Sequence, residues 1–244
     1  MSFDHKMNAS SVRPVWALPL LLFVSSLASA RSADIVEAAR AQIGKTVAYD
    51  SSYRRLAYPN GDVPMETGVC ADVVVRALRE ALGMDLQRLL HEDMKASFSK
   101  YPQKWGLKRP DKNIDHRRVP NLETYFRRRG WAVPVSQDPR DYLPGDLVTC
   151  IVPPHLPHIM IVSDRTNAMG RPLVIHNIGA GTREEDRLFA FTLTGHFRIK
   201  RIEPVGAANP DRSGPIRAQT NSTSSAIAPA SGLWPDRSAA GSRR

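Results

Sequence analysis

The hydrophobic pattern changes once along the chain, at Gly130, and this change constrains the fold more than any other feature. Before Gly130, apolar residues recur at intervals of three and four, which is typical of helices that bury one face. After it, apolar and polar residues alternate, which is typical of strands. Helices followed by a meander of strands predict an α+β fold, with N-terminal helices packed on an antiparallel β-sheet.

The same patterns give the expected elements. Helices are predicted over residues 32–44, 70–83, 86–98 and 120–130. Strands are predicted over residues 131–135, 147–152, 158–163, 172–178, 188–193 and 196–202. A long loop with three tyrosines precedes residue 70, and a polar loop covers residues 105–118. Loops of this length in a compact domain are commonly functional.

Both ends of the chain differ from the middle. Lys6 and Arg13 precede an apolar run over residues 15–27, and Ala28-Ser29-Ala30 follows. This order predicts a signal peptide over residues 1–30, cleaved after Ala30, and a periplasmic or secreted protein without a membrane span after cleavage. An uncleaved anchor is the alternative. Residues 206–244 are rich in Ala, Ser, Pro and Arg, which predicts a disordered basic tail. One domain, residues 31–205, remains.

The charge and the cysteine content narrow the classes of partner. The formal net charge is +10 and the pI is near 10.0. Nucleic acid is one partner for such a charge, but an exported protein meets anionic envelope polymers, so we expect no nucleic-acid partner. A merely soluble basic surface is the alternative. Cys70 and Cys150 are the two cysteines, which excludes a four-cysteine zinc site.

Cys70 stands where a helix is expected to begin. It lies within Gly68-Val69-Cys70-Ala71-Asp72 and is followed by an apolar helical pattern that ends at Gly83. The free N–H groups and the positive dipole end of a helix favour the thiolate form of cysteine. Cys70 is therefore a candidate nucleophile. The alternative is a small hydrophobic residue buried for packing.

Two of the seven histidines are placed to act as a base. If the loop between their strands is centred on Asn167, His158 and His176 are direct cross-strand partners, with Cβ atoms about 4.5–5.5 Å apart. One imidazole then takes the thiol proton and the other orients it. In another register, Asn177 is the alternative orienting residue. A single strand histidine taken alone is more often a structural residue, and the pairing makes the catalytic role more favourable.

Zinc binding is the alternative role for these histidines. His155, His158 and His176, with Cys150 or Cys70, form a candidate ligand set. Prolines interrupt the His155–His158 spacing, and no acidic general base stands nearby in the sequence. We therefore expect a thiol mechanism without a metal or a cofactor.

These residues resemble those of a known superfamily, the NlpC/p60-type, papain-like cell-wall hydrolases. The matching stretches, besides Cys70 and the tyrosine-bearing loop, are Ala41-Gln42-Ile43-Gly44-Lys45, Pro144-Gly145-Asp146-Leu147-Val148 and His158-Ile159-Met160-Ile161-Val162. The resemblance implies a papain-like fold, with Cys70 as nucleophile, His158 as base and His176 as orienting residue. It also implies that Tyr49 or Tyr53 donates to the oxyanion.

More closely, the chain resembles the bacterial DUF1287 family, a domain of unknown function placed in that superfamily. The matching stretches are Tyr58-Pro59-Asn60-Gly61-Asp62-Val63-Pro64, Gly68-Val69-Cys70, Asn113-Ile114-Asp115-His116-Arg117-Arg118-Val119-Pro120-Asn121-Leu122 and His176-Asn177-Ile178-Gly179. The commoner superfamily signature has Asp-Cys-Ser-Gly, whereas Val69-Cys70-Ala71-Asp72 stands here. The contacts with substrate near the nucleophile therefore differ.

Together these observations predict an exported cysteine peptidase or amidase that cleaves amide bonds through an acyl-enzyme. The expected substrate is peptidoglycan or another amide-bearing envelope polymer. Further candidates for oxyanion or substrate contacts are Tyr49, Tyr53, Asp72 and Asn177. Candidates for binding a carboxylate-bearing ligand, because arginine pairs with carboxylates through two hydrogen bonds, are Asp115, His116, Arg117 and Arg118. Their alternative is a structural salt-bridge cluster. The alternative for the whole domain is a non-catalytic envelope-binding module on the same fold.

Overall fold

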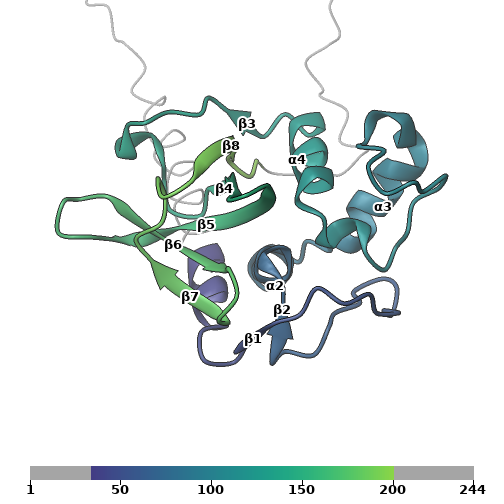
Figure 1. The fold of residues 1–244 in the computed structure, drawn as a ribbon, viewed down its shortest axis with the longest axis horizontal. Helices are drawn as coiled ribbons and strands as arrows, with labels where there is room; N and C mark the ends of the chain where they lie inside the picture. The colour runs from purple at the N-terminus through teal and green to yellow at the C-terminus, as the bar shows by residue number, and fades with distance from the viewer. Residues whose placement is uncertain (1–33, 201–244) are drawn as a thin grey trace, which may run out of the picture. The chain divides into compact units, whose positions relative to one another are not determined.

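A computed structural model of the chain describes residues 34–200. The expected signal peptide, residues 1–30, and the expected tail, residues 206–244, lie outside the described residues. The described part contains helices and a six-stranded antiparallel sheet (Figure 1), which confirms the α+β class. Within it, no helix has the length and apolar character that crossing a membrane requires.

The helices form where the apolar spacing predicts them. A first helix covers residues 34–40. It is followed by α2 (Cys70–Leu82), α3 (Leu86–Ser97) and α4 (Val119–Arg128), with short 3₁₀ turns η1 (Phe98–Lys100), η2 (Asp115–Arg117) and η3 (Pro139–Asp141). The α2 helix ends at Gly83, whose left-handed backbone (φ 63°) lets its N–H donate to the carbonyl of Arg79. The end of this helix is therefore fixed by its sequence.

The strands form two sheets. A short parallel pair joins β1 (Ala48–Tyr49) to β2 (Thr67–Gly68). The large sheet consists of β3 (Ala132–Val133), β4 (Leu147–Val152), β5 (Leu156–Thr166), β6 (Pro172–Asn177), β7 (Thr182–Glu185) and β8 (Thr192–Phe197). Its spatial order is β3-β8-β4-β5-β6-β7, so that β4 and β5 are central.

The last strands differ from the predicted ones. Strands were predicted over residues 188–193 and 196–202, but Leu188 lies in a turn, and a single strand, β8, covers Thr192–Phe197. The apolar side chains of residues 188–191 instead belong to an irregular segment that covers one face of the sheet. Strand β7, which precedes this irregular segment, was not predicted, because its sequence Thr-Arg-Glu-Glu has no apolar alternation. A charged edge strand of this kind is common, since it discourages pairing with other chains.

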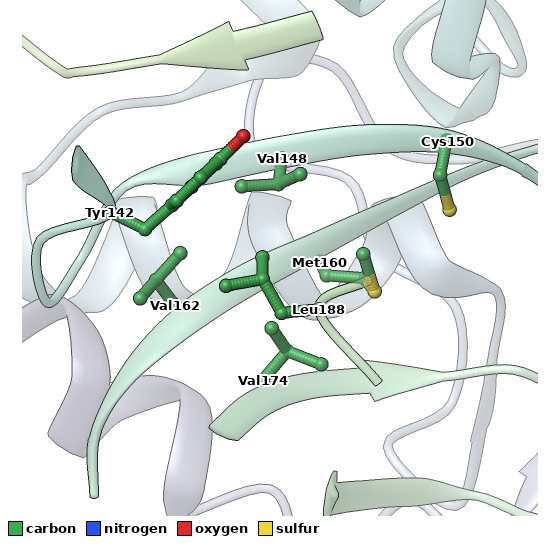
Figure 2. Close-up of a cluster of buried hydrophobic side chains, with 7 residues drawn as sticks. All are labelled: Tyr142, Val148, Cys150, Met160, Val162, Val174 and Leu188. Carbon is green, nitrogen blue, oxygen red and sulfur yellow. The ribbon is translucent and has the colours of Figure 1, made fainter. Parts of the chain in front are cut away.

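The large sheet is buried on both faces. On one face, Phe126 of α4 packs against Phe197 of β8, with ring centroids 5.3 Å apart. The other face carries a second buried cluster (Figure 2), whose members are Tyr142, Val148, Cys150, Met160, Val162, Val174 and Leu188. The α2 helix packs against β5 and β6, beside which it lies in Figure 1. The start of α2 is thereby brought to the middle of the sheet.

The register between β5 and β6 differs from the expected one by two residues. Ile161 pairs with Ile175 and Val162 with Val174, and the strands meet again at Thr166 and Pro172. The prediction that His158 and His176 are direct cross-strand partners was therefore wrong. Because side chains alternate along a strand, a shift of two residues keeps both histidines on the same face. They become diagonal neighbours, which remain within reach of each other.

Candidate functional site

The position of Cys70 is set by hydrogen bonds at the start of α2. Val69 is the N-cap residue, and its backbone N–H donates to Oδ2 of Asp72 at 2.6 Å. This is the reciprocal half of a capping box, in which an acidic residue in the first turn satisfies a free N–H group. A Cβ at Gly68 would lie 3.2 Å from both Cβ and Oδ2 of Asp72. Glycine at this position therefore allows the close approach.

Burial decides the protonation of Cys70. Its side chain is buried beneath the sheet, and burial raises the pKa of the thiol to about 11. The backbone N–H groups of Ile159, Ala71 and Cys70 itself lower that pKa, but by less than burial raises it. The expectation that the helix terminus yields a thiolate is therefore corrected: the resting group at neutral pH is the thiol.

His158 and His176 form the expected imidazole pair. Nε2 of His158 lies 2.7 Å from Nδ1 of His176, and both rings are buried. Burial, followed by the charge of His176, lowers the pKa of His158 to about 3. Burial also lowers the pKa of His176. Both rings are therefore neutral at pH 7, so that His158 is in the form that accepts a proton.

The thiol contacts the backbone of the strand that carries His158. The N–H of Ile159, the next residue along β5, points at the Cys70 sulfur. Burial, and to a smaller extent the nearby Cys70, raises the pKa of Cys150, the ladder partner of His158 on β4. Among residues 34–200, no hydrogen bond joins the thiol to the imidazole directly. Catalytic hydrogen bonds are often long in structures without substrate and tighten when substrate binds.

Asn177, the alternative orienting residue, points away from His158. Its Nδ2 donates to the carbonyl of Gly68 at 3.0 Å and to that of Ala48 at 3.3 Å. Asn177 therefore fastens β6 to the two short strands before Cys70. His176 is the residue that contacts the imidazole of His158.

Arg117 and Asp72 brace the entrance to the site. Nη2 of Arg117 lies 2.9 Å from Oδ2 of Asp72, and the side chains of both residues are almost fully buried. Nε of Arg117 also donates to Oδ1 of Asp72 at 2.9 Å, and the other guanidinium bonds go to the carbonyls of Ser52 and Asp50, at 3.1 and 2.9 Å. Since its donors are largely engaged, Arg117 positions the tyrosine-bearing loop against the first turn of α2.

A cavity of about 590 Å³ opens beside Cys70. Tyr49, Lys104, Trp105 and Arg118 are among the residues that line it, together with the thiol itself, and none of the lining residues is acidic. The Arg118 guanidinium stacks 4.2 Å from the centre of the Trp105 ring. The cavity therefore combines aromatic walls with positive charge, which suits a ligand with a negative group.

The two candidate tyrosines differ in what their hydroxyl groups do. The hydroxyl of Tyr53 donates to Oδ2 of Asp111 at 3.1 Å and accepts from Nδ2 of Asn113 at 2.8 Å. No hydrogen bond joins the hydroxyl of Tyr49 to another described residue. Burial and the nearby charge of Cys70 raise the pKa of Tyr49 to about 12, so that it remains a donor. The hydroxyl of Tyr49 is therefore more available than that of Tyr53 to donate a hydrogen bond to an oxyanion.

The four residues predicted to bind a carboxylate-bearing ligand, residues 115–118, have different roles in the structure. Asp115 is buried, accepts from the N–H of Asp111 at 2.5 Å and pairs with Arg118 at 3.0 Å. His116 is also buried, and burial lowers its pKa to about 4. Of these four residues, only Arg118 is partly exposed, and it lines the cavity. Its single ion pair with Asp115 leaves other guanidinium N–H groups without a partner among the described residues.

Some residues at this site were missed from the sequence. Lys104 lines the cavity and was not singled out, because nothing in a loop pattern marks its direction. Glu185 was hidden in the unpredicted strand β7; its Oε2 lies 3.5 Å from Nε2 of His176. His155, considered as a metal ligand, is exposed at the cavity rim. No group of three or more His, Cys, Asp or Glu side chains in residues 34–200 is placed to hold a metal ion.

Comparison with known proteins places this domain in a family. The family model described as a domain of unknown function (DUF1287) matches residues 36–199, a range that contains Cys70, His158, His176 and Glu185. The uncharacterized protein YijF of Escherichia coli (strain K12) is 57% identical over 164 residues, which cover 67% of this chain and 80% of that protein. The chain therefore belongs to the DUF1287 family.

Proposed function

We propose that this domain is a papain-like cysteine hydrolase of the NlpC/p60 type, which cleaves amide bonds in peptidoglycan peptides. The observation that supports the proposal is the hydrogen-bonded pair of neutral imidazoles, His158 and His176, together with a thiol at a helix N-terminus that is contacted by the backbone N–H of Ile159, the residue after His158. A nucleophile, a base and an orienting group are the parts that acyl transfer requires. The open cavity beside the thiol supplies room for a substrate.

The raised thiol pKa fits a base-assisted attack. As the sulfur of Cys70 bonds to the substrate carbonyl carbon, its proton passes to His158. The amide C–N bond then breaks, and the leaving amine takes that proton. Water, activated by the same imidazole, hydrolyses the thioester and restores the thiol. Because thiol and imidazole are both neutral at rest, no ion pair has to persist between turnovers.

Donors for the oxyanion lie at the start of the helix. The backbone N–H of Cys70 is one, since the first N–H groups of a helix have no intrahelical acceptor. The hydroxyl of Tyr49 is the second, because it lines the cavity and its pKa stays high. Removal of one such donor typically lowers kcat about 100- to 1,000-fold.

The cavity lining supports a substrate with a carboxylate. Lys104 and Arg118 contribute positive charge, and Trp105 and Tyr53 provide apolar walls. Peptidoglycan peptides carry free carboxylates next to their amide bonds, so they match this lining. An export signal over residues 1–30 and a periplasmic or secreted location complete the proposal, since the substrate lies outside the cytoplasm.

The test compares the purified protein with two cysteine variants. Peptidoglycan is digested with the wild type, Cys70→Ala and Cys150→Ala, and the products are identified by mass spectrometry. We expect new fragments from the wild type and Cys150→Ala, and none from Cys70→Ala. Fragments from Cys70→Ala in equal yield would overturn the mechanism. The fragment masses identify the bond that is cleaved.

A non-catalytic envelope-binding module is the second candidate. One observation favours it: Cys70 is a buried thiol whose pKa is raised to about 11, as expected for a packed side chain. Under this function, none of the three proteins releases fragments, but all of them sediment with insoluble peptidoglycan. Release of fragments by the wild type alone excludes it.

A further inference from the structure

The proton between His158 and His176 has two arrangements. Their contact joins Nε2 of His158 to Nδ1 of His176, and a neutral imidazole carries a single hydrogen on one of its two nitrogens. Either His158 donates through Nε2, or His176 donates through Nδ1. The first arrangement leaves Nδ1 of His158 as a free acceptor. The second places the hydrogen of His158 on Nδ1, where it blocks uptake of another proton.

Glu185 distinguishes the two arrangements. Its carboxylate oxygen Oε2 lies 3.5 Å from Nε2 of His176, a buried nitrogen that makes no hydrogen bond within the described residues. An ionised carboxylate only accepts hydrogen bonds, so it favours a hydrogen on Nε2 of His176. Nδ1 of His176 is then bare, and it accepts the hydrogen of His158 Nε2.

The fold holds Glu185 at this nitrogen. On β7, Glu185 is the ladder partner of Val174, and His176 pairs with Arg183, so the carboxylate is two residues along the same sheet face. Arg187 Nε lies 3.5 Å from Oε2, and Arg183 Nη1 lies 3.9 Å from Oε1. These two contacts hold the carboxylate of Glu185 in place beside His176.

We propose that Glu185 is a positioning residue that fixes the tautomers of both histidines and leaves Nδ1 of His158 free to take a proton. This inference rests on the proposed function, because the proton in question is that of the Cys70 thiol. No described residue hydrogen-bonds to Nδ1 of His158, so this nitrogen is available. The relay then runs from Glu185 through His176 to His158, with one hydrogen on each Nε2.

The test reads the tautomers directly. Full-length protein labelled with ¹⁵N at histidine is examined by long-range ¹H–¹⁵N correlation at pH 7, where the protonated and bare ring nitrogens have well-separated shifts. Assignment uses the variants His158→Gln and His176→Gln. We expect the hydrogen on Nε2 of both rings in the wild type. In Glu185→Ala, we expect loss of this preference and a detectable Nδ1–H population at His176.

Glu184→Gln is the matched control, because Glu184 is adjacent on β7 and bonds instead to Arg40 and Ser163. It should leave both tautomers unchanged. A wild-type His176 that carries its hydrogen on Nδ1 overturns the inference, and so do tautomers in Glu185→Ala identical to the wild type. The spectra need no substrate, so an absence of turnover with the expected tautomers counts against the hydrolase and not against the role of Glu185.

Discussion

Arg117 and Asp72 form a buried ion pair, Nη2 to Oδ2 at 2.9 Å, which joins the loop before α2 to the first turn of that helix. The same carboxylate accepts the N–H of Val69, and the same guanidinium holds two carbonyls of the loop. The pair therefore sets the position of Cys70 and of one wall of the cavity. Its contribution to function is through position, since little of Arg117 is left to bind a ligand.

Arg117→Ala should destabilise the domain strongly. The substitution leaves Asp72 buried without its counter-charge, and loss of one partner from a buried pair typically costs about 3–5 kcal/mol. We expect the free energy of unfolding in urea to fall by about that amount. A change below about 1 kcal/mol would show that the pair is not structural.

Arg118→Ala is the comparison, because Arg118 is partly exposed and stacks on Trp105 at the cavity. We expect its unfolding free energy to fall by less than that of Arg117→Ala, because the Arg118 side chain is partly exposed and its partner Asp115 keeps the hydrogen bond from the N–H of Asp111. Its binding to soluble peptidoglycan peptides should weaken, and amidation of the peptide carboxylates should remove the difference. Equal binding by the wild type and Arg118→Ala would contradict the carboxylate site.

The rate of Cys70 alkylation should depend steeply on pH. Only the thiolate reacts, and burial raises the pKa of this thiol to about 11. In a Cys150→Ala background, we expect the iodoacetamide rate to rise about tenfold per pH unit from pH 7 to about pH 10. Rapid labelling at pH 6 would show instead that an ion pair with an imidazolium forms at rest. Unfolded protein, in which a thiol titrates near pH 8.5, is the control.

His158→Ala and His176→Ala should affect turnover differently. In the proposed mechanism His158 exchanges the proton with substrate, and removal of a general base typically lowers the rate about 100- to 10,000-fold. His176 acts through its contact with His158, so His176→Asn retains an acceptor and should keep part of the activity that His176→Ala loses. Measurement of kcat on the peptide that peptidoglycan digestion identifies checks this order. Full activity in His158→Ala would rule out its role as base.

The part of this site that depends on local pattern was predictable. The start of α2 at Cys70 follows from the turn residues before it and the helical apolar spacing after it. The prediction that His158 and His176 lie on the same face follows from strand alternation. It remained correct although the predicted register was wrong by two residues, because an even shift does not change the face. Local propensity and hydrophobic period act over a few residues, so a single sequence expresses them directly.

The missing part depends on long-range packing. Glu185 lies on a strand without apolar alternation, and no local feature brings it to His176. The thiol pKa was predicted in the wrong direction, because the helix terminus is visible in the sequence whereas the depth of burial is not. The sequence over residues 105–118 shows neither helical nor strand periodicity, so it did not predict burial. This loop nevertheless contributes the most buried arginine of the site, Arg117.

Acid should destabilise the domain through its buried histidines. Burial lowers the pKa of His116 to about 4 and that of His158 to about 3, whereas an unfolded histidine titrates near 6.5. Below pH 6.5 the unfolded chain therefore binds protons that the folded chain does not bind. The contribution of the two histidines to stability is complete above pH 6.5 and is lost as pH falls to about 4 for His116 and about 3 for His158. Each such histidine adds up to about 1.4 kcal/mol per pH unit to the slope of unfolding free energy.

His116→Gln isolates one of these histidines. We expect its unfolding free energy, measured in urea between pH 6.5 and 5.0, to fall with pH less steeply than that of the wild type, by the share of one group. His155→Gln is the matched control, since His155 is exposed, and it should keep the wild-type slope. Because the readout is a slope, a uniform loss of stability in His116→Gln does not obscure it. A slope unchanged by His116→Gln would mean that His116 takes up its proton equally in the folded and unfolded chain, contrary to its burial beside Arg117.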